Sequence, residues 1–158
     1  MKKQQSGFTM IELIMVIVIL GILAAFALPR FADFGSDARA ASINGALGAA
    51  KSASAIVHSA VLAKGVTAGT GGASDYVTLE GKNITVAHGY PTADNAGIIA
   101  AAGLEGDFTI SSGKVTQNGT PASATNCGFV YTAAADADTP ATFTAVSGTL
   151  PVKADDCK

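Results

Sequence analysis

The chain begins with a long run of apolar residues. From Phe8 to Leu28 only Thr9 and Glu12 are polar. About 20 apolar residues are enough for a helix to cross the hydrocarbon core of a bilayer. Because Lys2 and Lys3 precede the run, the positive-inside rule predicts a cytoplasmic N-terminus and an exported remainder. We therefore expect a membrane-spanning helix followed by an exported part.

A second, amphipathic pattern follows Pro29, and it has the period of a helix. Apolar or small residues recur at steps of three and four, and the charged residues lie off that stripe. Gly65 is typical of a helix end. We expect one helix from Phe8 to Lys64, roughly 85 Å long at 1.5 Å per residue, whose apolar first half protrudes. The stripe consists of Ile43, Leu47, Ala50, Ser54, Val57 and Val61.

Two residues weaken the first half of this helix. Pro29 has no N–H to donate to the carbonyl of Ala25, and Gly21 is a poor helix former. The segment between Gly21 and Pro29 is therefore expected to unwind more easily than its neighbours.

The residues after Gly65 favour short strands. A four-residue loop, 80–83, separates the first pair of strands, and the alanine-rich stretch 93–104 predicts a short helix capped by Thr92 or Asp94. We expect an α+β fold in which the second half of the long helix packs on a four- to five-stranded antiparallel sheet. The predicted strand pairs are Tyr76–Leu79 with Ile84–Val86, Phe108–Ser111 with Lys114–Thr116, and Gly128–Thr132 with Thr142–Val146.

Composition and charge argue against several function classes. The formal net charge is −2 and only 14% of the residues are charged, so a basic nucleic-acid face is not indicated. His58 and His88 do not have metal-ligand spacing, and no nucleophile elbow or phosphate-binding loop is present. We identify no catalytic residue, cofactor site or metal site. Asp136-Ala137-Asp138 and Asp155-Asp156 could offer oxygen ligands to Ca²⁺, but such runs are more typical of solvated loops.

Two cysteines, Cys127 and Cys157, lie in the exported part. An oxidising compartment favours one disulfide between them, and two free thiols are the alternative. The bond would stabilise the fold by roughly 3 to 4 kcal/mol on the chain-entropy account.

Glu12 does not fit a simple membrane anchor. A carboxylate in lipid costs a few kcal/mol, and the apolar run contains no cationic side chain that could pair with it. Cleavage after Gly7 would create an α-amino group on Phe8, which could pair with Glu12 of a neighbouring molecule. The sequence thus predicts an assembly mechanism based on Phe8 and Glu12.

The stretch from Gly7 to Leu13, followed by the apolar run and Pro29, resembles the prepilin signature of type IV pilins. The resemblance implies that a prepilin peptidase cuts between Gly7 and Phe8 and methylates the Phe8 amine. It also implies that identical subunits polymerise through their helices, with the help of the inner-membrane assembly machinery, into an extracellular filament. In related pili the segment between Gly21 and Pro29 melts on leaving the bilayer.

The exported head is similar to that of mannose-sensitive haemagglutinin (MSHA) type pilins. The similarity rests on Gly89-Tyr90-Pro91 and on the run from Asn126 to Thr132. It implies a major pilin that serves adhesion to surfaces, with motility and DNA uptake as further roles. The implied parts are a leader (1–7), an apolar assembly helix (8–30), an amphipathic half (31–64) and a β head (65–158).

Two other functions remain open from the sequence. A major pseudopilin of type II secretion shares the leader, Glu12 and the helix, and surface filaments would distinguish the two. A secreted binding module with an ordinary signal peptide is the other, because Ala25-Phe26-Ala27 matches a signal-peptidase site. A mature chain that begins at Leu28 would indicate that module.

Overall fold

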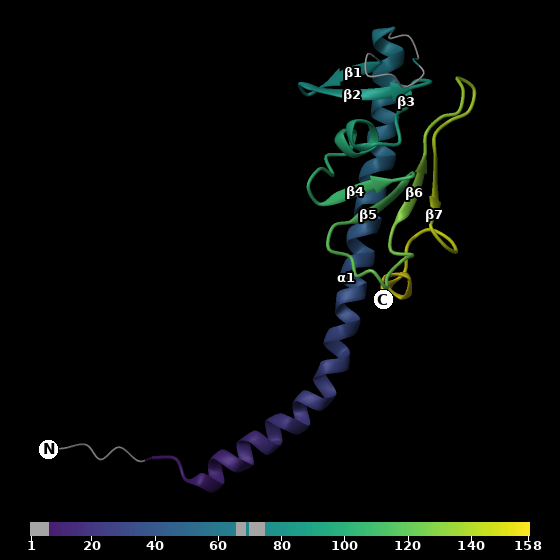
Figure 1. Cartoon of the computed structure of the whole chain (residues 1–158). Helices are drawn as coiled ribbons and strands as arrows, with labels where there is room; N and C mark the ends of the chain where they lie inside the picture. The colour runs from purple at the N-terminus through teal and green to yellow at the C-terminus, as the bar shows by residue number, and fades with distance from the viewer. Residues whose placement is uncertain (1–6, 66–68, 70–74) are drawn as a thin grey trace, which may run out of the picture. The chain divides into compact units, whose positions relative to one another are not determined.

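A computed structural model describes residues 7–65, 69 and 75–158, so residues 1–6 of the predicted leader lie outside the described residues. A long N-terminal helix is followed by short antiparallel strands (Figure 1), which confirms the α+β fold class. The elements are α1 (Met10–Lys64), β1 (Tyr76–Leu79), β2 (Lys82–Ala87), β3 (Tyr90–Pro91), the π-helix η1 (Asn95–Ile99), β4 (Phe108–Ser111), β5 (Lys114–Gln117), β6 (Phe129–Thr132), β7 (Thr142–Ala145) and the 3₁₀-helix η2 (Ala154–Cys157).

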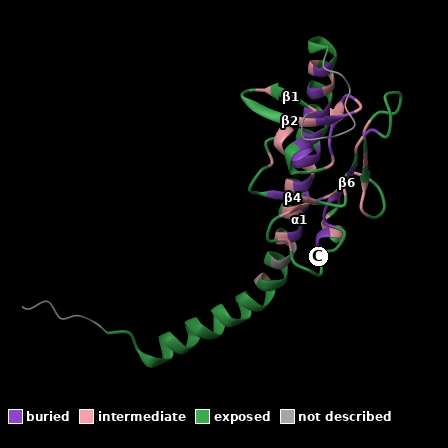
Figure 2. Cartoon of the chain, turned by 45° about the horizontal axis from the view of Figure 1, so that its top comes forward, coloured by how far each residue is buried: buried purple, intermediate pink, exposed green. Residues whose placement is uncertain are grey.

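The chain divides into two compact units, Met1–Gly35 and Ser36–Lys158, and α1 contributes to both. In the first unit the described residues of α1 are exposed almost without exception, as the green ribbon of Figure 2 shows. The second unit holds the remainder of α1, all the described strands and both short helices.

All three predicted strand pairs form, but the strands make two sheets rather than the single sheet of four to five strands that the sequence predicts. One sheet has the order β1-β2-β3 and the other β4-β5-β6-β7. The two-residue strand β3 shows no sequence period. The helix η1 contacts β2 of the first sheet and β4 of the second, so it lies between the two sheets (Figure 1).

The first hairpin has a tighter loop than predicted. Leu79 faces Lys82 across the ladder, so the loop has two residues and not four. Its residues Glu80 and Gly81 have φ values of 50° and 80°, the left-handed pair of a turn that matches the twist of the strands. The ladder therefore continues up to the turn.

The predicted stripe of α1 is buried along its whole length. Its first part packs in a core with residues of β4, β5 and β6, and Val57 and Val61 pack in a second core with Val77, Ile84 and Val86. The helix ends at Lys64, and Gly65 follows with φ of +60°. Each sheet thus covers its own segment of the helix.

The alanine-rich stretch contains the short helix that the sequence predicts, in the form of the π-helix η1. Asp94 is its N-cap, and the Asp94 carboxylate accepts a hydrogen bond of 2.7 Å from the N–H of Gly97. A Cβ on Gly97 would lie 2.2 Å from the carbonyl oxygen of Thr92, so the widened turn fits only glycine here.

Candidate assembly helix and disulfide region

The N-terminus of α1 is capped by its own first residues. The side-chain oxygen Oε2 of Glu12 accepts hydrogen bonds from the Thr9 N–H at 2.8 Å and the Thr9 hydroxyl at 2.6 Å. The Glu12 N–H in turn donates to the Thr9 hydroxyl at 3.3 Å. Thr9 and Glu12 therefore form a capping box. Glu12 thus has a local hydrogen-bond partner that we did not predict, although the spacing Thr-x-x-Glu before an apolar run is the sequence signal for this box.

The capping box gives Glu12 hydrogen bonds but no counter-charge. Both hydrogen bonds from Thr9 go to Oε2, so Oε1 retains the capacity to accept donors from another molecule. The helix that follows is long and apolar enough to cross a membrane. The most hydrophobic stretch of 18 residues has a mean hydropathy of 2.9, and none of it is buried.

The residues predicted for cleavage and for helix flexibility lie in different local structures. Gly7 and Phe8 precede α1, and the Phe8 side chain is 90% exposed. The bond between them is therefore outside the helix. Gly21 and Pro29 both lie inside α1, which is helical through both positions. Unwinding between them stays a prediction about the filament.

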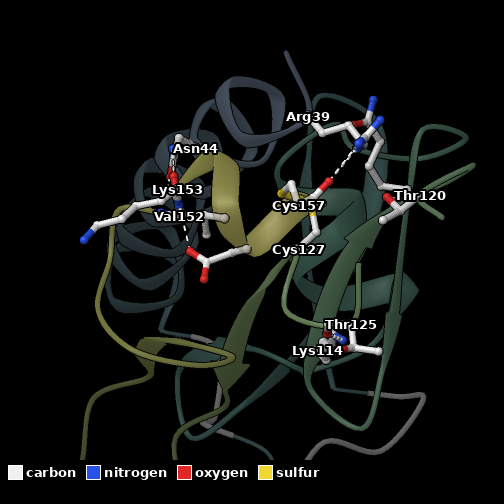
Figure 3. The surroundings of a disulfide bond; sticks show 11 residues. Arg39, Asn44, Lys114, Thr120, Thr125, Cys127, Val152, Lys153 and Cys157 are labelled. Carbon is white, nitrogen blue, oxygen red and sulfur yellow. Dashed lines mark hydrogen bonds between the residues drawn. A yellow bond between two sulfur atoms is a disulfide. The ribbon is translucent and has the colours of Figure 1, made fainter. Parts of the chain in front are cut away.

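The second site is the disulfide region at the C-terminus. Cys127 and Cys157 form a disulfide across a sequence separation of 30 residues, as the sequence predicts. The guanidinium of Arg39 donates to the carbonyl oxygen of Cys157 at 3.1 Å from Nε and 2.7 Å from Nη2, as Figure 3 shows. This bond explains why Arg39, a charged residue, is half-buried on α1.

A second contact attaches the same segment to α1. The side chain of Asn44 donates to the Val152 carbonyl at 2.8 Å and accepts from the Val152 N–H at 2.9 Å (Figure 3). Together with Arg39 and the disulfide, this pair fixes the C-terminal segment between α1 and the four-stranded sheet. Neither Asn44 nor Arg39 was identified from the sequence, because no local pattern marks a contact more than 100 residues away.

The acidic residues near the C-terminus interact locally. The Asp136 carboxylate accepts a hydrogen bond of 3.1 Å from the Asp138 N–H, and a hydrogen bond from Thr139 is the main cause that lowers the Asp136 pKa. Asp155 pairs with Lys158 at 2.6 Å, which lowers the pKa of Asp155. Among the described residues, no three His, Cys, Asp or Glu side chains are grouped as metal ligands.

His58 connects α1 to the turn between β2 and β3. Its Nδ1 lies 3.0 Å from the Gly89 oxygen, and because a carbonyl only accepts, Nδ1 carries the proton. The His58 ring stacks on Tyr90 with centroids 4.2 Å apart and an interplanar angle of 7°. The histidine therefore has a packing role that the sequence did not indicate.

The comparisons with known proteins match both the N-terminus and the head. The family described as the prokaryotic N-terminal methylation motif matches residues 2–28. The type IV narrow pilus major component PilA5 of Thermus thermophilus is 37% identical over 112 residues, which cover 71% of this chain and 91% of the relative. The chain belongs to the type IV pilin family. In this pilin, Gly7, Phe8, Glu12 and Gly21 lie within the matched motif.

Two other relatives match shorter stretches of this pilin. The type IV major alpha-pilin of Moraxella bovis is 51% identical over 49 residues, or 31% of each chain. The type IV major fimbrial protein FimA of Dichelobacter nodosus is 54% identical over 41 residues, or 26% of each chain. No solved structure matches the pilin significantly.

Proposed function

We propose that this pilin is the major structural subunit of a type IV pilus, with no catalytic role of its own. It is made as an inner-membrane precursor with a cytoplasmic N-terminus and then polymerises into an extracellular filament. The observation that carries the proposal is the apolar start of α1, which is exposed in the described chain. Such a surface needs lipid or other copies of the chain to cover it. The similarity to a major pilus component favours other copies of the chain as the cover.

Processing creates the charge that directs assembly. Prepilin peptidase cuts between Gly7 and Phe8, which precede α1, and methylates the new Phe8 amine. The amine of one copy then pairs with Oε1 of Glu12 in a neighbouring copy, while Thr9 keeps its hydrogen bonds to Oε2. In a water-poor bundle of helices this pairing is strongly favoured, because an unpaired carboxylate there is costly.

We assign each part of the chain a role in this assembly. Residues 1–7 are the leader, 8–30 the assembly helix, 31–64 the amphipathic half and 65–158 the head. The inner-membrane assembly machinery extracts each subunit, and the helix unwinds between Gly21 and Pro29 as the subunit enters the filament.

The head is of the MSHA type, and the filament serves adhesion to surfaces, with motility and DNA uptake as further roles. The turn that carries Gly89 joins β2 to β3, and Tyr131 of β6 donates to the Pro91 carbonyl at 2.7 Å. The two segments on which the head similarity rests are thus in contact, which supports their use as one signature.

The test compares two substitutions of Glu12 that differ in charge and in capping. In Glu12→Gln the side-chain amide oxygen can still complete the capping box, but the negative charge is lost. Glu12→Ala loses both. We expect both variants to be processed to a chain that begins at methylated Phe8, seen by mass spectrometry, and both to give few surface filaments in electron microscopy. Asp138→Asn, an exposed site in the head outside the groove described below, controls for the general loss of a carboxylate.

Three results would contradict the proposal. Normal filaments from Glu12→Gln would show that capping, and not charge, is the role of Glu12. A mature unmodified chain that begins at Leu28 would indicate a secreted binding module. Protein secretion that depends on the chain, without surface filaments at normal expression, would indicate a pseudopilin.

A further inference from the structure

The head contains an apolar groove beside α1. Its volume is about 420 Å³, and its walls are one face of α1, the β1–β2 hairpin and the segment 100–103. Ala53 and Ile56 of α1, Ile84 of β2 and Ala101 are among its lining residues. Ile56 is 59% exposed although it is a large apolar residue, so the groove leaves apolar surface uncovered.

An exposed aromatic pair lies elsewhere on the same chain. Phe31 and Phe34 are 71% and 64% exposed, and their ring centroids are 6.4 Å apart. They follow the predicted membrane-spanning helix, so in the precursor lipid can cover them. In a filament that has left the bilayer, lipid no longer does so, and the two rings need another apolar surface.

The sizes and charges of the two surfaces are complementary. A cavity of about 150 Å³ is large enough to hold one benzene molecule, so a groove of 420 Å³ has room for two phenyl rings. Glu80 lies at the groove, where Lys82 is already neutralised by an ion pair with Glu105. Arg30 precedes Phe31 and shares a helix face with Phe34, four residues later.

We propose that Phe31 and Phe34 of one pilin copy insert into the groove of a second copy, with Arg30 of the first beside Glu80 of the second. This inference rests on the proposed function, since it describes a contact within the filament. The aromatic pair and the groove are different surfaces of the same chain, so the contact is heterologous. Repetition of a heterologous contact that does not close into a ring generates an open helical filament.

Cysteine cross-linking tests the contact in intact filaments. Cells that express Phe34→Cys and Ala101→Cys chains together should form mixed filaments, and mild oxidation should give disulfide-linked dimers on non-reducing gels. The control mixture combines Phe34→Cys with Thr149→Cys, a head position that is exposed and not among the lining residues of the groove. We expect roughly tenfold more dimer from the groove mixture, because the contact raises the local thiol concentration. Because the native disulfide is fully buried, we expect the two added thiols, and not Cys127 or Cys157, to form the cross-link.

Charge reversal provides a second readout that does not need cysteine variants. Arg30→Glu and Glu80→Arg should each lower the filament yield several-fold, and the double variant should restore most of it. If the double variant restores the filament yield, the contact is supported. If the yield stays low, the contact is overturned, even where the cysteine chains do not assemble. Normal filaments in which the groove mixture gives no more dimer than the control also overturn the groove contact, and they leave the proposed function standing. Failure of the unmodified chain to form filaments would instead overturn the proposed function.

Discussion

Tyr131 joins the two sheets of the head, and its hydroxyl can be removed without changing the ring. The side chain is fully buried on β6, and the hydroxyl donates to the carbonyl of Pro91 on β3 at 2.7 Å. Tyr131→Phe removes this bond and leaves the buried carbonyl without that donor. The loss of a buried hydrogen-bond partner costs about 1 to 3 kcal/mol. Because the ring contact with Phe143, at 5.0 Å between centroids, can remain, we expect the free energy of unfolding to fall by that amount.

The same substitution changes the response to alkaline pH. Burial raises the pKa of the Tyr131 phenol above its ordinary value of 10.0. Above pH 10 the unfolded chain therefore releases a proton that the folded chain still holds, and unfolding becomes easier as the pH rises through that window. The free energy of unfolding of the unmodified chain should fall there by up to about 1.4 kcal/mol per pH unit. Below pH 10 this contribution to stability is fully present.

The measurement is guanidinium unfolding of the full chain in a non-ionic detergent, followed by circular dichroism at pH 7 and at several values above pH 10. Tyr131→Phe should be less stable at pH 7, and the difference from the unmodified chain should narrow above pH 10, since the titration of lysines is common to both. Tyr76→Phe is the matched control, because Tyr76 is 43% exposed and should change stability by less than about 0.5 kcal/mol. A difference of less than 0.5 kcal/mol at pH 7, or one that stays constant above pH 10, would refute the reasoning.

Two further predictions concern the stability of the head. Replacing both Cys127 and Cys157 by Ser should lower the free energy of unfolding by roughly 3.5 kcal/mol for a loop of this length, measured in the same assay, and a change below about 1 kcal/mol would contradict the entropic account. Gly97→Ala should cost about 3 kcal/mol, the upper end of the usual cost of overpacking, because its Cβ would meet the backbone of Thr92. Gly45→Ala, which meets open space on a helix, should be neutral or stabilising, and equal effects of the two would argue against the clash.

The sequence alone determined the features that depend on local period and spacing. The apolar run, the buried stripe from Ile43 to Val61 and the end of α1 before Gly65 follow from helical periodicity and from glycine's tolerance of positive φ. The three strand pairs follow from short β-favouring runs around turn residues. The capping box of Thr9 and Glu12 is local as well, and its spacing was present in the sequence.

Only the tertiary structure decided which distant groups meet. The strands separate into two sheets, and η1 contacts a strand of each. The Tyr131–Pro91 bond joins residues 40 apart, and the bond from Arg39 to the Cys157 carbonyl joins residues 118 apart. Such contacts form because each sheet must cover its own segment of α1 and bring its buried polar groups to partners. No pattern within a single segment carries that information, whereas the local periods of the helix and strands do.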